Sequence, residues 1–264
     1  MSATSTAPLL SPTVPALRSL PAELVASYRE RGFCKIEGLL TPEQCARFRA
    51  ESLRLTSDVG KLNGSAGYQR VLTQRVNIWR DSTIMAELTL HPQLCAWATQ
   101  LAGMPLRLWH DHALIKQPMN GAATEFHQDQ PYWPHRDSPQ PISAWIALQD
   151  VPVERGCMSF IPGTHHLTDL RSSDLADPTG LVSLRPELAW AERVTLPLRA
   201  GDLTFHHGRT AHMANANATD QHRVAHTVIF IPRTTRFSGG GHVCTNGIGF
   251  KPGEIIAGEL FPEV

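Results

Sequence analysis

The sequence lacks an excess of charge of either sign, with 24 Lys and Arg against 24 Asp and Glu in 264 residues. Aromatic residues make up only 7%, and no basic stripe is interleaved with them, which argues against a nucleic-acid-binding surface. Every apolar run is well short of the roughly 18 residues that a transmembrane helix needs. We therefore expect no nucleic-acid partner, no membrane span and a cytoplasmic protein.

Cysteine is also scarce: the five residues are widely spaced and no CxxC pair occurs, so we expect reduced, buried thiols and no cysteine-based zinc site. Glycine motifs of the GxGxxG type are absent as well. Residues 1–20 are rich in Ser, Thr, Ala and Pro but lack the features of a secretory signal. We expect a disordered tail over 1–20 and a single domain over 21–264, since 42% hydrophobic residues suffice for a packed core.

The first third of the chain carries helix signals. A helix is expected from residue 22 to 31, where Gly32 ends it, followed by a short strand over 33–40. Thr41 and Gln44 have the spacing of a capping box, with proline at the first helical position, so a second helix should run to about residue 54. Two more helices are expected near 84–90 and 92–101.

After Gly103 the pattern changes to short apolar segments separated by Pro, Gly, Asn or Asp. Such spacing is typical of an all-β sandwich or barrel. The expected strands cover 106–117, 142–148, 157–161, 193–198, 203–206 and 224–231. The predicted fold class is mainly β with flanking helices, and its double-stranded β core begins near residue 104.

The first chemical signal is the pair His127 and Asp129. In a strand, residues two apart point to the same side, so an imidazole and a carboxylate can reach one point. Two histidines and one carboxylate are the usual ligands of ferrous iron that keeps positions open for dioxygen. A second HxD, at 135–137, lies between prolines and is expected to be a loop facing the substrate.

The third ligand is less clear, because His206, His207 and His212 are all available and spacing alone does not choose among them. Arg223 begins an apolar strand, where a buried guanidinium needs a carboxylate. It could pair with a dicarboxylic acid or with a structural acidic residue. His110 and His112 could form a second metal site, but no third ligand is apparent nearby in the sequence.

These motifs, in this order, resemble the phytanoyl-CoA dioxygenase (PhyH-like) family of 2-oxoglutarate oxygenases. The resemblance extends from about residue 21 to 232 and includes the stretches YRERGFCKIEGLL, HALIKQ and GCMSFIPGTH. Trp145 follows His127 by 18 residues and Arg223 follows His212 by 11, as the family pattern requires. The family fold is a double-stranded β-helix, also described as a jelly-roll or cupin-like core.

The resemblance implies a role for each matching residue. His127, Asp129 and His212 would be catalytic and hold Fe(II), and Arg223 would bind the far carboxylate of 2-oxoglutarate. The expected co-substrate pocket further includes Trp145, Lys116 and His112. One departure is Ala214, where the family often has serine; a hydroxyl could come instead from Thr227.

The implied reaction is hydroxylation of a small-molecule metabolite with O2, releasing succinate and CO2, although desaturation, epimerisation and ring closure use the same cofactors. Few Lys and Arg lie near the site, so a CoA thioester is not favoured over a free metabolite. The expected substrate contacts are Tyr132, Trp133, His135 and Trp79. The protein is expected to be a monomer or small homo-oligomer.

Two alternatives remain at this stage. One is a cupin-like metalloenzyme that does not use 2-oxoglutarate, which the position of Arg223 argues against. The other is a non-catalytic metabolite-binding β sandwich. Binding of 2-oxoglutarate separates the first alternative from the main hypothesis, and binding of Fe(II) separates the second.

Overall fold

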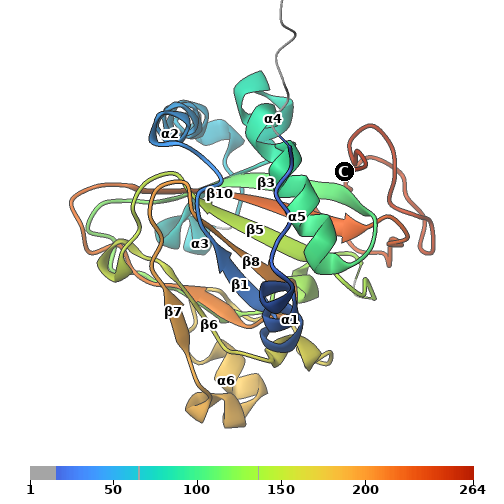
Figure 1. Ribbon diagram of the computed structural model, residues 1–264. Coiled ribbons are helices and arrows are strands. Elements are labelled where there is room, and N and C mark those ends of the chain that lie inside the picture. Colours follow the sequence, from blue (N-terminus) through green and yellow to red (C-terminus); the bar gives the residue numbers. More distant parts are fainter. Residues whose placement is uncertain (1–15, 65, 136) are drawn as a thin grey trace, which may run out of the picture.

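Two antiparallel sheets face each other in the computed structural model, which describes residues 16–64, 66–135 and 137–264 (Figure 1). The larger sheet has six strands in the order β1-β8-β5-β10-β3-β2, and the smaller sheet has four in the order β4-β9-β6-β7. The strands of the larger sheet are β1 (Phe33–Ile36), β8 (Leu203–His207), β5 (Ile142–Ala147), β10 (Arg223–Pro232), β3 (Leu106–Lys116) and β2 (Thr73–Val76). Those of the smaller sheet are β4 (Thr124–His127), β9 (His212–Ala214), β6 (Met158–Phe160) and β7 (Val194–Leu196). This confirms the expected fold class, a mainly β protein with a double-stranded core.

Helices cover the outer face of the larger sheet, opposite the smaller sheet (Figure 1). These helices are α1 (Ala22–Arg31), α2 (Pro42–Thr56), α4 (Thr83–Thr89) and α5 (Pro92–Ala102). Helix α6 (Gly180–Leu184) lies beside the smaller sheet, and α3 (Ala66–Val71) precedes β2. Strand β10 shows how the sheet separates two environments. Val224 and Val228 pack into the helix-side core, whereas Arg223 and Thr227, on the alternate face, line a cavity between the sheets.

The space between the sheets is filled at one end by a compact apolar cluster. Phe33 of β1 stacks on Phe160 of β6 with ring centroids 4.6 Å apart, which joins the two sheets directly. Trp145 and Ala225 belong to the same cluster. Next to this cluster, a cavity between the sheets is lined by both polar and apolar side chains.

The remainder of the chain after β10, residues 233–264, has little regular secondary structure and lies against one end of the larger sheet (Figure 1). It packs through Phe237, Cys244 and Phe261 against Trp109 of β3. Phe261 and Trp109 are stacked with centroids 5.5 Å apart. This segment therefore brings its own side chains next to β3.

Most expected elements are confirmed to within two residues, and the differences have local causes. The first strand ends at Ile36 because Gly38 adopts a φ of 67°. Helix α3 and strands β2 and β9 were not predicted from the sequence. Residues 1–15 of the expected tail, 1–20, lie outside the described residues. Of the rest, Leu20 is buried and the backbone of Arg18 bonds to the side chain of Gln93.

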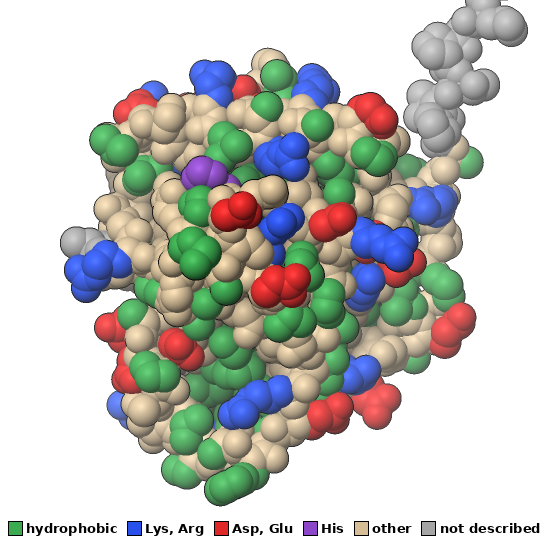
Figure 2. Space-filling view, turned by 90° about the vertical axis from the view of Figure 1, so that its left-hand side faces the viewer, with side chains coloured by type: hydrophobic (Ala, Val, Ile, Leu, Met, Phe, Trp, Pro, Cys, Tyr) green, Lys and Arg blue, Asp and Glu red, His purple; other side chains and the backbone are tan. Residues whose placement is uncertain are grey.

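The surface agrees with the balanced composition. On the face shown in Figure 2, basic and acidic side chains are interspersed and no large area of one sign forms. Among the described residues, no helix is both long enough and apolar enough to cross a bilayer.

Candidate active site

His127, Asp129 and His212 come together at the edge of the smaller sheet. His127 and His212 are direct partners in the antiparallel pairing of β4 with β9. Their Nε2 atoms lie 3.4 Å and 3.6 Å from Oδ1 of Asp129, and the three ligand atoms fall within 4.8 Å of one another. This is the two-histidine, one-carboxylate donor set expected for ferrous iron.

The position of Asp129 corrects one part of the sequence argument. Strand β4 ends at His127, and Asp129 follows it in a helical conformation with φ −73° and ψ −44°. The strand alternation invoked for His127 and Asp129 therefore does not apply. The turn into the short 3-10 helix Gln130–Tyr132 directs the carboxylate toward the histidines instead.

Both histidines are oriented by hydrogen bonds from the ring nitrogen that faces away from Asp129. Nδ1–H of His127 donates to the carbonyl of Glu125 at 2.6 Å, and Nδ1–H of His212 donates to that of Thr210 at 2.9 Å. These bonds place the proton on Nδ1 and leave the Nε2 lone pairs for a metal. Burial lowers the pKa of His212 well below its ordinary value, which keeps it neutral.

The second oxygen of Asp129 is also held. Ser143 donates to Oδ2 at 3.2 Å, and Nε2 of His206 lies 3.4 Å from the same atom. Burial by itself would raise the pKa of Asp129, but His212, His127 and His206 together bring this pKa well below the ordinary range. His206 thus contacts the Asp129 carboxylate, and His207 pairs with the Pro139 carbonyl. Of the three histidines left open by the sequence, His212 is therefore the one whose position fits a third metal donor.

A narrow cavity leads from the triad to Arg223, whose side chain is almost completely buried at 1% exposure. Its Nη1 donates to the Leu114 carbonyl at 3.2 Å, and its guanidinium lies 5.3 Å from the ring centroid of Trp145. Within the described part of the chain, its Nε has no hydrogen-bond partner and no carboxylate lies within ion-pair distance. Burial lowers the pKa of Arg223 to about 10, so it remains charged at neutral pH. A buried cation without an anion fits an anionic ligand in this cavity.

Three further residues surround this cavity or its closed end. His112 lines the cavity and pairs through Nδ1 with Gln74 at 2.8 Å. Lys116, opposite Arg223 in the β3–β10 register, is fully buried and donates from Nζ to the Ala122 carbonyl at 2.7 Å. Thr227 also lines the cavity, and its buried hydroxyl has no partner among the described residues.

A wider cavity of about 300 Å³ opens on the other side of the triad. Tyr132 and Trp133, two of the four predicted substrate contacts, line it. The other two expected contacts lie elsewhere: His135 is fully buried with its ring edge-on to Trp109, and Trp79 packs against the helix-side core. Neither residue is among those that line the wider cavity, so a role of His135 or Trp79 in substrate binding stays a prediction.

Tyr68 of α3 lines both cavities and is missing from the sequence-based site. Burial raises the pKa of its hydroxyl; Asp129 adds to this shift and Arg223 opposes it, so the hydroxyl lies close to both charges. From the sequence, the stretch 58–74 is a candidate region for substrate contacts, but nothing in it singles out Tyr68, because 58–67 reads as a loop and α3 was not expected.

Comparison with known proteins agrees with this geometry. The sequence model of the phytanoyl-CoA dioxygenase (PhyH) family matches residues 28–225. The peroxisomal phytanoyl-CoA dioxygenase of Rattus norvegicus is 27% identical over 219 residues, which cover 75% of this chain and 64% of that protein. This chain therefore spans less than two thirds of that relative's length.

Two solved structures from nogalamycin biosynthesis are more similar. The non-haem α-ketoglutarate-dependent carbocyclase SnoK is 34% identical with a TM-score of 0.82, covering 93% of this chain and 96% of SnoK. The epimerase SnoN, in complex with Fe3+, α-ketoglutarate and nogalamycin RO, is 36% identical with a TM-score of 0.80, covering 91% and 97%.

The fold and the donor set thus define a non-haem iron and 2-oxoglutarate-dependent dioxygenase. The chain belongs to the phytanoyl-CoA dioxygenase family. Both alternatives, a metalloenzyme that does not use 2-oxoglutarate and a non-catalytic sandwich, are disfavoured by this membership.

Proposed function

We propose that this protein hydroxylates a small, uncharged organic molecule, with His127, Asp129 and His212 as the iron ligands and Arg223 as the partner of the far carboxylate of 2-oxoglutarate. The observation that carries the proposal is the buried, unpaired Arg223 at the end of the cavity that begins at the triad. A dicarboxylate in this cavity would neutralise the guanidinium with one end and meet the metal with the other.

When bound, iron and 2-oxoglutarate supply a strong oxidant from O2, with succinate and CO2 as products. The protein provides ligands, orientation and a dry cavity. Trp145 holds the Arg223 guanidinium under its ring, and the free hydroxyl of Thr227 is available for the co-substrate in place of the family serine. His112 and Lys116 complete the polar surroundings on the β3 side.

The wider cavity supports a flat, neutral substrate. Its lining combines aromatic rings, Tyr68, Tyr132 and Trp133, with neutral imidazoles. Among the described residues that line it, none is a Lys or Arg that would recognise the phosphates of a CoA thioester. Two solved structures that are 34% and 36% identical to this chain come from the biosynthesis of nogalamycin. We infer an aromatic, oxygen-bearing polycycle as the substrate class.

Ring closure or epimerisation is the second candidate reaction. It is favoured by the 34% and 36% identity to proteins described as a carbocyclase and an epimerase. The same ligand set serves each reaction, so the position of the substrate, not the metal site, would decide among them.

The first experiment is anaerobic titration with Fe(II) and then 2-oxoglutarate, following the weak visible charge-transfer band of the ternary complex. We expect the band in the wild type and its loss in His212→Ala. In Arg223→Met, half-saturation should need a 10- to 100-fold higher 2-oxoglutarate concentration, a loss of about 1.4 to 2.7 kcal/mol of binding free energy. Exposed His166 and Arg199 provide matched controls, since His166→Ala and Arg199→Met should behave as wild type. An unchanged 2-oxoglutarate requirement in Arg223→Met would contradict the assignment of Arg223.

A further inference from the structure

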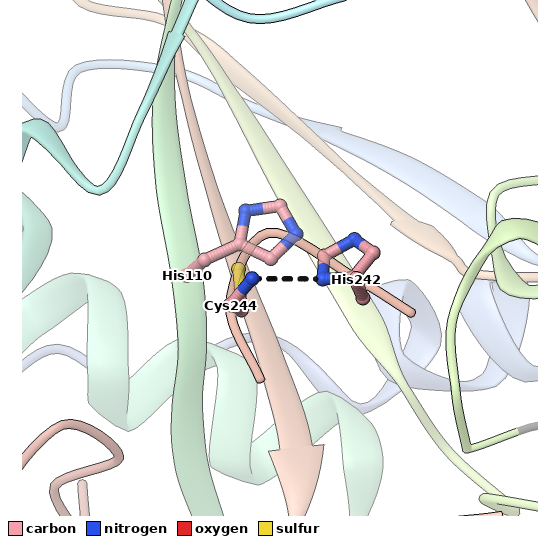
Figure 3. A group of neighbouring side chains, drawn as sticks. All are labelled: His110, His242 and Cys244. Carbon is pink, nitrogen blue, oxygen red and sulfur yellow. Dashed lines mark hydrogen bonds between the residues drawn. The ribbon is translucent and has the colours of Figure 1, made fainter. Parts of the chain in front are cut away.

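His110, His242 and Cys244 form a second group of side chains that could hold a metal ion (Figure 3). His110 belongs to β3, and His242 and Cys244 belong to the segment that follows β10. One ligand atom from each falls within 4.8 Å of the others. His110 and Cys244 are buried and His242 is partly exposed.

The environment of His110 is the strongest indication of a missing ligand in this group. It is 3% exposed, and neither ring nitrogen has a hydrogen-bond partner among the described residues. An imidazole buried without any partner loses its hydration without compensation, which costs about 1 to 3 kcal/mol. Burial, followed by the neighbouring His112 and His242, lowers the pKa of His110 well below its ordinary value, so a lone pair is available.

The two other donors are held in place by neighbouring groups. Nδ1 of His242 accepts the backbone N–H of Cys244 at 3.2 Å, so the neutral ring carries its proton on Nε2 and has its lone pair on Nδ1, where a metal would replace this hydrogen bond. The His242 ring stacks on Trp109 with centroids 5.2 Å apart. The side-chain amide of Asn77 lies 3.7 Å from the Cys244 sulfur, in position to donate a hydrogen bond to it. The Asn77 Oδ1 is itself buried without a partner. Supporting contacts of this kind orient ligands around metal ions.

We propose that His110, His242 and Cys244 form a second metal site that binds a borderline-soft divalent cation of the zinc type. Two imidazoles and a thiolate suit such an ion and exclude the hard cations Mg2+ and Ca2+, which prefer oxygen ligands. Three protein ligands leave one position of a tetrahedral site open.

The place of this site in the molecule suggests its use. His110 and His242 line the wider cavity together with His127 and Asp129 of the iron triad. The open position of the second metal would face that cavity, where it can bind a hydroxyl or keto oxygen of the substrate as a Lewis acid and fix its orientation. The second metal site shares no ligand with the iron site, and its existence does not depend on the proposed function.

Metal binding at this site must release a proton. Burial raises the pKa of the Cys244 thiol to about 12, so the thiol carries its proton in the metal-free protein. The cation replaces that proton when the sulfur becomes a ligand, as in other thiolate sites.

The test uses Co2+ as the probe, added to full-length protein carrying His212→Ala so that the triad is disabled. We expect one equivalent of Co2+ to produce a near-ultraviolet thiolate-to-cobalt band, which the triad cannot produce because it contains no cysteine. Adding Cys244→Ser should abolish the band, and His110→Ala should weaken Co2+ binding at least tenfold. Buried Cys95, which lies in α5, is the matched control, and Cys95→Ser should retain the band.

Absence of the near-ultraviolet band with the fold intact by circular dichroism would overturn the proposal, as would a band that survives Cys244→Ser. Displacement of the band by Zn2+ would support it. The visible iron and 2-oxoglutarate band, measured on wild type and Cys244→Ser, reports the triad separately. Failure at one site is therefore distinguishable from failure at the other.

Discussion

At the scale of single residues, the two oxygens of Asp129 have different environments. Oδ1 faces the two histidines of the triad, and Oδ2 is held by Ser143 and His206 from the larger sheet. The carboxylate is thus positioned by residues that would not themselves touch the metal. Partners of this kind usually contribute 10- to 100-fold to metal affinity.

Replacing Ser143 by alanine tests this support. Ser143→Ala should weaken Fe(II) binding about tenfold, because Asp129 loses one of the two contacts that orient it. The measurement is anaerobic Fe(II) titration. Ser159, a buried hydroxyl that bonds to Thr195 at 2.8 Å, is the matched control, and Ser159→Ala should leave the affinity unchanged. Equal affinities for the Ser143 and Ser159 variants would show that the Ser143 contact does not matter.

Lys116 provides a prediction about pH. Burial, together with the nearby Arg223, lowers its pKa to about 7 in the folded protein, whereas the unfolded chain keeps the proton to about pH 10.4. Between these values the unfolded state binds more protons, so the free energy of unfolding should rise with pH from 7 toward 10. Below pH 7 Lys116 is protonated in both the folded and the unfolded state, so the full free-energy cost of burying its charge remains.

Lys116→Met should remove this penalty. We expect the variant to gain on the order of 3 kcal/mol at pH 7 and to lose the part of the pH dependence that Lys116 causes. Urea unfolding at pH 7 and pH 9.5 measures both effects, and Lys251→Met, at an exposed position, serves as the control. Wild-type and Lys116→Met stabilities that run parallel over this range would show that Lys116 keeps its proton in the fold.

At the scale of elements, the end of α1 shows how a local signal and a tertiary contact coincide. Gly32 ends the helix with a φ of 83°, and its carbonyl accepts a hydrogen bond from the Thr210 hydroxyl at 2.7 Å. A Cβ at this position would lie 2.4 Å from Oγ1 of Thr210 and 2.5 Å from Nδ1 of His165. Thr210 is also the residue whose carbonyl orients His212.

Gly32→Ala should therefore destabilise the protein by about 2 to 4 kcal/mol, more than backbone strain alone. Gly38→Ala separates the two causes, because Gly38 also has a positive φ, 67°, but no atom lies within 4 Å of its added Cβ. We expect about 1 kcal/mol for that variant. Thermal unfolding measures the loss of stability in each variant. Similar losses for Gly32→Ala and Gly38→Ala would mean that Thr210 and His165 move aside without an energetic cost.

Not all of the other elements could be predicted from the sequence. The capping box at Thr41 and Gln44 forms as predicted, with both reciprocal hydrogen bonds present. Strands β2 and β9 were missed because each is short, with four and three residues, and is fixed by pairing with a distant partner. Local sequence carries little information about such strands, since their hydrogen bonds are made across the chain.

At the scale of the whole molecule, the site is assembled from both sheets and the segment after β10. The smaller sheet brings His127 and His212 together, and the larger sheet contributes Ser143, His206 and Arg223. The C-terminal segment then lines the wider cavity with His242. The approach to the iron triad thus depends on residues that lie far apart in the sequence.

The fold class and the helical first third could be predicted from local sequence patterns. The order of the motifs, through the family resemblance, made His127, Asp129, His212 and Arg223 the candidate site residues. The packing of the chain determines that Asp129 lies beyond its strand, that Tyr68 lines both cavities, and that His135 and Trp79 are not among the residues lining the wider cavity. It alone placed Cys244 beside His110, 134 residues away in the chain. The physical reason is the same in each case: burial and pairing across the chain depend on which surfaces the packed sheets bring together.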